Sequence, residues 1–369
     1  MKKILVLGTG MPQKDLIVAC KGRGFEVHAC SYRSGDPGEY VADHFALINI
    51  TDADAVFDYA SENNIDIIYS AGSDIAMPTA FTVSEKLGKK TYCSPRTAEI
   101  CNTKNLLRNE LGPEFIGNIP YQTIRSKKEE ITVAYPFMIK PVDSQGQRGV
   151  FRIESYEDFL KHFDESMSHS RVKQLILEQF IEGEEISVNT FSVNGEMVFF
   201  LPSERIVWEG FSGGLIHKHL LPGKWAEKPD VMEKVHDLVE RTLLAVNISE
   251  GPAYFQIMID HSGTPYLVEV TPRLDGCHMW RLIRFSTGID LLSLTIDGLE
   301  GKKIGQIPTY SVAPYETEFL CQPPATVFKR SNHRVGESEF LEWYYKDDDI
   351  VHPMNGYMEK CGYVIRKLI

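Results

Sequence analysis

A lysine at the end of an apolar run is the first residue whose surroundings indicate chemistry. Lys140 closes the run 137–139, and the loop 143–149 that follows contains two glycines and an arginine. Backbone N–H groups of such a loop can wrap phosphate oxygens, while a lysine adds a point charge. The alternative is an ordinary exposed strand end. The loop lacks the GxxxxGK[ST] pattern, so it is not a P-loop.

An acidic residue ends a second apolar run. Glu178 follows residues 175–177, and Glu185 lies seven positions further on. A carboxylate at Glu178 can accept a hydrogen bond from a purine amino group, backbone atoms of 179–181 can bond the ring edge, and Glu185 can hold ribose hydroxyls. The alternative is an acidic turn exposed to solvent.

A β-hairpin is predicted over residues 253–270, around a serine–glycine turn. The antiparallel register that this turn predicts places Asp260 opposite Pro265 and Gln256 opposite Glu269. Because strand side chains alternate between faces, these last two side chains share one face of the hairpin.

Glu269 lies between two valines, where an ionised carboxylate needs a partner. Thr271 belongs to the same face. One partner is a magnesium ion, which takes carboxylate and amide oxygens together with phosphates. The other is Arg273, in a buried ion pair. Both readings stay open on the residues alone.

Alternating strands and helices are predicted for residues 1–100, which favours a parallel α/β sheet. The expected strands are 4–7, 26–29, 45–48 and 65–69, and the expected helices are 15–23, 54–62 and 75–86. Gly8-Thr9-Gly10 follows the first strand, but the dinucleotide fingerprint needs a third glycine where this chain has Gln13. A tight strand-to-helix turn is the simpler interpretation, and a nicotinamide-dependent oxidoreductase is disfavoured.

The rest of the chain has a different pattern of predicted elements. Strands are expected at 137–140, 150–153, 174–178, 185–193 and 215–221, and a long helix at 229–246. The tail from about residue 301 mixes prolines and aromatics and is interpreted as a small α+β module.

Composition narrows the functional classes. The 369 residues carry a formal net charge of -12, which argues against a nucleic-acid-binding protein. The seven cysteines form no CxxC pair, so a reduced, cytoplasmic protein is expected. The apolar run near the N-terminus is too short for a signal peptide, and no run of about 18 apolar residues is present, so no membrane association is expected.

The order of the three motifs, strand–Lys–glycine loop, strand–Glu and hairpin–Glu-x-x-x-Arg, resembles the ATP-grasp superfamily over roughly residues 1–300. Biotin carboxylase, carbamoyl phosphate synthetase, D-alanine–D-alanine ligase and several purine-biosynthetic ligases are members. The resemblance implies an α/β fold in three parts. These are an N-terminal parallel α/β pre-ATP-grasp domain at 1–101, a two-lobed α+β ATP-grasp domain at 102–300 and a C-terminal α+β module at 301–369. The nucleotide-binding lobe is expected at about 115–183.

The resemblance also implies roles for individual residues. Expected to contact ATP are Lys104, Lys140, Ser144, Gln145, Gly146, Arg148, Gly149, Glu178, Gln179, Phe180, Ile181 and Glu185. Gln256, Glu269 and Thr271 occupy the magnesium-ligand positions, with Mn²⁺ as a substitute ion. Lys140 and Arg273 are the expected catalytic residues, with Arg273 beside the transferred phosphoryl group.

Two positions depart from the family pattern. Thr271 replaces the usual asparagine, and glutamine at position 256 is similar to carbamoyl phosphate synthetase, so Glu269 is the only carboxylate among the expected ligands. The segment 274–278 replaces the usual Gly-Gly. The acceptor side of the site, where the second substrate binds, is therefore expected to differ from that of other family members. The residues expected to shape that side are Arg205, His217, His219 and Asp275.

The implied reaction is activation of a carboxylate as an acyl phosphate by MgATP and its joining to an amine, with release of ADP and phosphate. The amine is expected to be an amino acid or amino sugar. A bicarbonate-activating carboxylase or carbamoyl-phosphate-forming enzyme and a non-catalytic ATP-binding regulatory protein are the alternatives. Small-molecule substrates and a homodimer are the expected partners.

Overall fold

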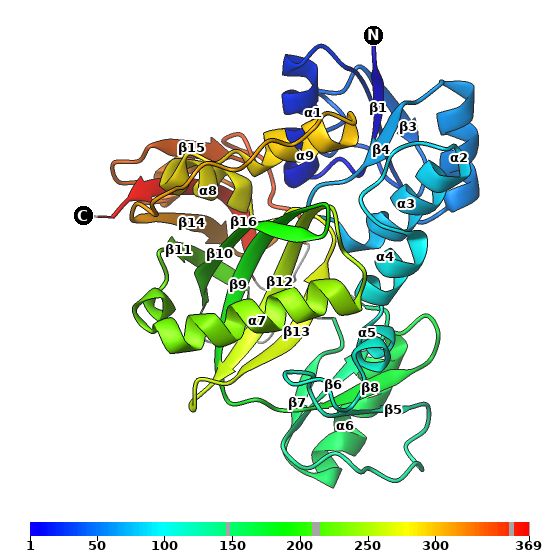
Figure 1. The fold of residues 1–369 in the computed structure, drawn as a ribbon, viewed down its shortest axis with the longest axis vertical. Coiled ribbons are helices and arrows are strands. Elements are labelled where there is room, and N and C mark those ends of the chain that lie inside the picture. The colour runs from blue at the N-terminus through cyan, green and yellow to red at the C-terminus, as the bar shows by residue number, and fades with distance from the viewer. Residues whose placement is uncertain (145–147, 209–214, 354–357, 369) are drawn as a thin grey trace.

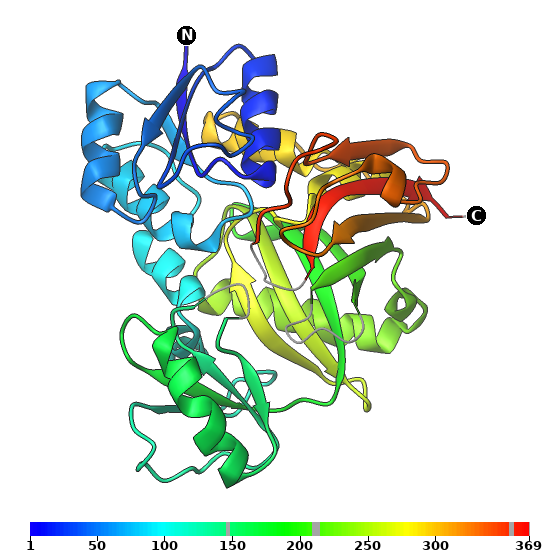
Figure 2. The same ribbon diagram turned by 180° about the vertical axis from the view of Figure 1, so that it is seen from behind.

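Three β-sheets organise the chain in the computed structural model, which describes residues 1–144, 148–208, 215–353 and 358–368. The N-terminal sheet and the sheet of the nucleotide lobe lie at opposite ends of the long axis, with the largest sheet between them (Figure 1; Figure 2). No helix of the described ranges is long and apolar enough to cross a membrane.

The N-terminal sheet is parallel, as predicted, with the strand order β3-β2-β1-β4. Its elements are β1 (Lys3–Leu7), α1 (Met11–Gly22), β2 (Glu26–Ser31), β3 (His44–Leu47), α2 (Ala53–Glu62), β4 (Ile67–Tyr69), η1 (Asp74–Ala76) and α3 (Met77–Lys86). The helix expected at 75–86 is therefore divided, since a 3-10 turn precedes α3. Two short helices, α4 (Pro95–Asn102) and α5 (Lys104–Leu111), lead out of this domain.

The nucleotide lobe is a four-stranded antiparallel sheet covered by one helix. Its strand order is β5-β8-β6-β7. The elements are β5 (Tyr121–Ile124), β6 (Phe137–Pro141), β7 (Phe151–Ile153), α6 (Tyr156–Ser168) and β8 (Leu175–Gln179). Phe159 and Phe163 of α6 pack on Phe137 and Ile139 of β6, which leaves Lys140 at the end of a well-anchored strand.

The largest sheet has eight strands and runs through the middle of the molecule, with the order β13-β12-β9-β10-β11-β14-β16-β15. The strands are β9 (Gly183–Val193), β10 (Glu196–Val207), β11 (Ile216–Leu221), β12 (Gly251–Asp260), β13 (Pro265–Thr271), β14 (Tyr315–Gln322), β15 (Phe340–Trp343) and β16 (Glu359–Lys367). The last three strands come from the expected C-terminal module, so this segment extends the central sheet rather than forming a sheet of its own.

Helix α7 (Pro229–Ala245) covers one face of the central sheet at the β12–β13 hairpin. Its buried residues Val235, Leu238 and Val239 repeat at helical spacing and pack against apolar side chains of β12 and β13. Because strand side chains alternate, the opposite face of these strands carries the polar side chains.

The hairpin register is partly as predicted. Gln256 faces Glu269, as expected, but Ile259 rather than Asp260 faces Pro265. A β-bulge on β13 absorbs the difference, because Val268 is an extra residue between the pairs Gln256–Glu269 and Ile257–Leu267. The bulge turns Leu267 and Val270 toward α7 while Glu269 stays on the polar face.

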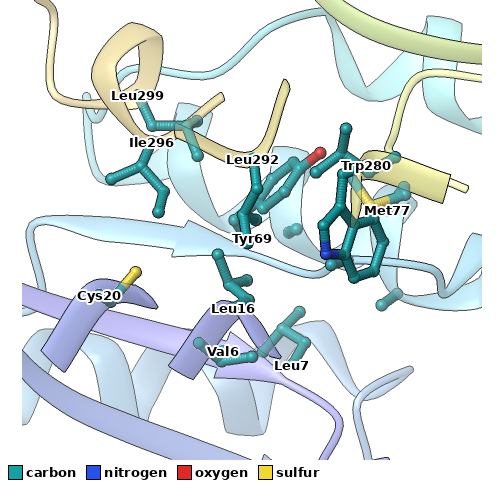
Figure 3. Packing of buried hydrophobic residues seen from close by; sticks show 14 of the residues in the cluster. Val6, Leu7, Leu16, Cys20, Tyr69, Met77, Trp280, Leu292, Ile296 and Leu299 are labelled. Atoms are coloured by element: carbon teal, nitrogen blue, oxygen red, sulfur yellow. The ribbon is translucent and has the colours of Figure 1, made fainter. Parts of the chain in front are cut away.

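Two helices from the C-terminal half complete the core of the N-terminal domain. Trp280 lies on α8 (Met279–Thr287), and Leu292, Ile296 and Leu299 lie on α9 (Leu291–Leu299). Figure 3 shows these side chains gathered around Leu16 and Tyr69. One continuous hydrophobic cluster therefore joins the first and last thirds of the chain.

Gly72 marks a close approach of two backbone segments. Its φ of 69° is left-handed, and a Cβ atom there would lie 2.6 Å from Cα of Gly276. Only glycine fits both conditions. The contact holds the segment after β4 against the segment 274–278, which is expected to shape the acceptor side.

Candidate active site

A buried carboxylate and two cations form the centre of the nucleotide side. The Glu178 side chain on β8 is 2% exposed and accepts from Lys140 Nζ at 2.6 Å and from Arg108 Nε at 2.8 Å. Burial opposes ionisation of Glu178, but Arg108 and Lys140 outweigh it and lower its pKa to about 2. Glu178 therefore remains ionised and fixes the Lys140 ammonium at the mouth of the lobe.

Arg108 is a residue of this site that the sequence analysis does not identify. Its guanidinium also donates to the carbonyl oxygen of Val268 at 3.0 Å, which lies in the bulged part of the hairpin. One side chain of α5 thus ties the nucleotide lobe to the hairpin. The signal in the sequence is a charged residue between Leu107 and Leu111 on the buried face of an amphipathic helix.

Lys104 lies one helical turn from Arg108 and reaches the glycine loop. Its Nζ donates to the carbonyl oxygen of Ser144 at 2.6 Å. Burial lowers the pKa of Lys104 and repulsion from Lys140 adds to the fall, while the carboxylates of Glu269 and Glu178 oppose it. Charged residues from all three sequence motifs therefore influence the Lys104 ammonium group.

The glycine loop is described only at its two ends. Gln145 and Gly146 lie outside the described residues. Gly149 has a φ of 71°, and a Cβ atom there would lie 3.1 Å from Ser166 Cα on α6. The loop end is therefore seated directly on α6.

The predicted adenine and ribose residues lie where the chain leaves the lobe. Gln179 ends β8, Phe180 and Ile181 connect it to β9, and the Phe180 ring packs 4.0 Å from the Arg152 guanidinium. Glu185 on β9 forms an ion pair with Arg205. Their nucleotide contacts remain predictions.

The expected metal ligands lie together on the polar face of the hairpin. Gln256 and Glu269 are directly paired across β12 and β13, and Thr271 Oγ1 lies 3.4 Å from Glu269 Oε1. Burial raises the pKa of Glu269, and repulsion from Asp74 adds to the rise. A carboxylate, an amide and a hydroxyl are oxygen donors of the kind that Mg²⁺ takes, so the donor set fits this ion.

Arg273 pairs with a different residue from the one the sequence suggested. The ion pair with Glu269, one of the two readings left open for that carboxylate, is not formed, because Arg273 donates instead from Nε to Asp74 Oδ1 at 2.6 Å. Its guanidinium also lies 5.2 Å from the ring centre of Tyr254. Burial opposes the charge on Arg273, but Asp74 raises its pKa beyond the ordinary value. Asp74 begins η1 in the N-terminal domain, a partner that no local pattern reveals.

Buried polar groups gather at the predicted acceptor side. The side chains of His219 and Asp275 are buried, and their Nε2 and Oδ2 atoms lack hydrogen-bond partners among the described residues. Burial lowers the pKa of His219 well below its usual value, with repulsion from Arg205 and Lys360, and burial raises the pKa of Asp275. One ligating atom each from His219, Asp275 and Cys277 lie within 4.8 Å of one another.

His217 takes a different environment from His219. Its ring stacks on Trp208 with centroids 3.9 Å apart, and Nε2 lies 3.1 Å from Glu318, which is also 3.8 Å from Lys218. The structure thus gathers Arg205, His219 and Asp275 but leaves His217 in a separate charged cluster.

A cavity of about 1300 Å³ adjoins this acceptor side. Its walls come from the N-terminal domain, the glycine loop, the central sheet and the C-terminal strands, and include Gly10, Arg148, Arg205, Gly276 and Lys360. Lys140, Glu178 and Glu269 do not line it. The arrangement therefore has two parts, the charged cluster where nucleotide contacts are predicted and a large chamber that this cluster does not line.

A family model described as an ATP-grasp domain matches residues 133–280. This range begins before β6 and ends in α8, so it contains Lys140, Glu178, Glu269 and Arg273.

Curated relatives share sequence with most of the chain. A formate-dependent phosphoribosylglycinamide formyltransferase of Bacteroides thetaiotaomicron is 26% identical over 322 residues, which cover 83% of this chain and 81% of the relative. A protein of the same name from Prochlorococcus marinus is 27% identical over 220 residues, or 57% and 56% of the two chains.

Solved structures match the whole fold. Phosphoribosylglycinamide synthetase from Anaerococcus prevotii superimposes with a TM-score of 0.78 at 17% identity, covering 99% of this chain and 94% of that one. An L-amino acid ligase from Bacillus licheniformis gives 0.79 at 18% identity, covering 99% and 93%.

Proposed function

Because this chain belongs to the ATP-grasp superfamily, we propose that it is an ATP-dependent ligase that activates a carboxylate as an acyl phosphate and joins it to an amine. The products are ADP and phosphate. The observation that carries this proposal is the direct contact between the three motifs, because Glu178 binds Lys140 and Arg108 joins Glu178 to the carbonyl oxygen of Val268 in the hairpin. Such a cluster suits phosphoryl transfer, in which positioning and charge stabilisation supply most of the catalysis.

Each residue then has a definite task. Lys140 and Lys104 bind phosphate oxygens, and Glu178 holds Lys140 in place. Arg273, held by Asp74, neutralises charge on the phosphoryl group as it moves to the carboxylate. Gln256, Glu269 and Thr271 would hold Mg²⁺, which supplies charge neutralisation on the phosphates when bound.

The amine enters from the large chamber. Arg205 lines this chamber, while Asp275 and His219 lie buried beside it with partnerless polar atoms. A polar acceptor fits this chamber better than an apolar one, since charged side chains such as Arg205 and Lys360 line its wall. The curated relatives are named as formate-dependent formyltransferases acting on a phosphoribosylated glycinamide, so formate is one of the acids to test.

The test is a hydroxylamine trap. The protein is incubated with MgATP, hydroxylamine and a panel of acids that includes formate, bicarbonate and amino acids, and ADP, AMP and hydroxamate are measured. We expect one acid to give hydroxamate and stoichiometric ADP. Arg273→Ala should reduce hydroxamate formation at least a hundredfold while ATP affinity changes less than tenfold, because its charge acts chiefly in the transition state.

A matched control is Arg284→Ala, which removes an exposed arginine of α8 paired with Asp290. It should leave both readouts unchanged. Stoichiometric AMP would defeat the mechanism. ATP hydrolysis stimulated by bicarbonate alone would support the carboxylase alternative, and ATP binding without turnover on any acid would support a regulatory protein.

A further inference from the structure

Two imidazoles and a carboxylate meet at the amino edge of the N-terminal sheet. Glu26 and His28 lie two residues apart on β2, and His44 on β3 is the direct neighbour of His28 in the parallel register. All three side chains therefore project from the same face. The large chamber borders the opposite, carboxyl edge, through Gly8 and Ser31.

The ligating atoms of these three residues converge closely. Nε2 of His28 and Nε2 of His44 each lie 3.2 Å from the same oxygen, Oε1 of Glu26. The three ligating atoms lie within 4.8 Å of one another, and the two rings stack with centroids 4.4 Å apart. A tetrahedral zinc ion with bonds of about 2.0–2.1 Å separates its ligands by about 3.3 Å, so the two short spacings already suit an ion.

The surroundings add a second layer of support. Nδ1 of His28 lies 2.9 Å from the hydroxyl of Tyr59 on α2, a partner that can fix the ring with Nε2 toward Glu26. The His28 side chain is 2% exposed and that of His44 is 51% exposed. The cluster is thus anchored on its buried side and open to ions and water on the other.

One cation competes at this position. Lys3 Nζ lies 3.4 Å from Glu26 Oε1, and its side chain is 30% exposed. An ammonium on a flexible, partly exposed stem can swing into solvent at small cost. Its presence shows that the carboxylate attracts positive charge at this point.

We propose that Glu26, His28 and His44 form a binding site for a divalent transition-metal ion of the zinc class, with water completing the coordination. Mixed imidazole and carboxylate ligands suit Zn²⁺, Co²⁺ and Ni²⁺ rather than Mg²⁺. The site pins β2 to the edge strand β3 and stabilises the N-terminal domain. It lies outside the nucleotide site and does not depend on the proposed ligase reaction.

The experiment uses the full chain, stripped with a chelator and titrated with Zn²⁺ in the absence of ATP and Mg²⁺. We expect one zinc per chain by calorimetry and elemental analysis, a zinc-dependent rise in Tm, and visible d–d absorption when Co²⁺ replaces zinc. His44→Ala removes an exposed ligand and should fold normally, yet bind zinc at least tenfold more weakly.

The matched control is His236→Ala, which removes a half-exposed histidine of α7 that faces Glu240. It should bind zinc like the unmodified chain. Lys3→Met should bind zinc more tightly, because a competing charge is removed. The proposal is overturned if the chain binds no zinc, or if His44→Ala keeps its zinc, for example at the buried set of His219, Asp275 and Cys277.

Discussion

At the scale of single residues, the nucleotide side depends on carboxylates whose charges have different environments. Glu178 is buried between two cations, whereas burial of Glu269 and repulsion from Asp74 outweigh the attraction of Lys104 and Arg273. Ionisation of Glu178 therefore stabilises the folded protein, whereas ionisation of Glu269 destabilises it.

We expect Glu178 to dominate the acid sensitivity of the fold. Its pKa falls from 4.5 to about 2 on folding, so its contribution is present above pH 4.5 and is lost as the pH falls toward 2. The shift corresponds to roughly 3 kcal/mol. Glu178→Gln should lower the free energy of unfolding at pH 7 and flatten its decline below pH 5, measured by urea denaturation.

Asp164→Asn is the matched control, since Asp164 is an exposed carboxylate of the same lobe paired with Lys127. It should change the unfolding free energy by less than about 1 kcal/mol. An acid limb of unchanged slope in Glu178→Gln would contradict the assignment.

Glu269→Gln should change the stability of the protein in the opposite direction from Glu178→Gln. Because burial and Asp74 raise the pKa of Glu269, its ionised form opposes folding, and this penalty grows as the pH rises from 4.5 through the raised value. The variant should keep or slightly raise the Tm of the metal-free protein at pH 7 but lose Mg²⁺-dependent turnover.

Glu204→Gln changes a carboxylate of β10 that accepts from the backbone of Lys224, away from the hairpin, and serves as the control. A Glu269→Gln protein with a normal Mg²⁺ dependence of turnover would remove this residue from the metal site.

At the scale of elements, the packing of loops against one another contributes to the stability of the fold, as the strands do. We expect Gly72→Ala to destabilise the protein by more than about 2 kcal/mol, because a left-handed backbone and a 2.6 Å contact with Gly276 act together. It should also raise KM for the acceptor, since segment 274–278 must shift.

Gly88→Ala separates these two effects. Gly88 has a similar φ of 63°, but no atom lies within 4 Å of an added Cβ. Its cost should be only the backbone strain of about 1 kcal/mol, with normal turnover. Equal unfolding free energies for the two variants would show that the Gly72–Gly276 contact is unimportant.

The elements themselves were largely predictable, because apolar periodicity reports which face of a strand or helix is buried. Lys140, Glu178 and Glu269 could be singled out as charged residues at the ends of, or within, apolar strands. The bulge opposite Gln256 could not be predicted, since it follows from fitting Leu267 and Val270 to α7.

At the scale of the whole molecule, the site depends on contacts between residues far apart in the chain, which could not be predicted from the sequence. Arg108 meets Glu178 across 70 positions and Arg273 meets Asp74 across 199. A single sequence offers no local signal for such partners. Likewise, nothing in the segment 279–299 reveals that α8 and α9 pack on the first sheet (Figure 3).

The nucleotide lobe enters and leaves the rest of the chain at one place. Tyr121 of β5 pairs directly with Glu178 of β8, and the backbone of Gln179 donates to Pro120 at 2.9 Å. Residues 121–178 therefore resemble a domain insertion. The two ends of the segment lie side by side, and the rest of the chain has its own hydrophobic core. Such a segment can be exchanged between related chains or tagged at its boundaries without cutting the surrounding fold. Chimeras that carry a foreign lobe would then change nucleotide preference, and they would alter the acceptor chamber only at the wall that includes Arg148 and Gly149.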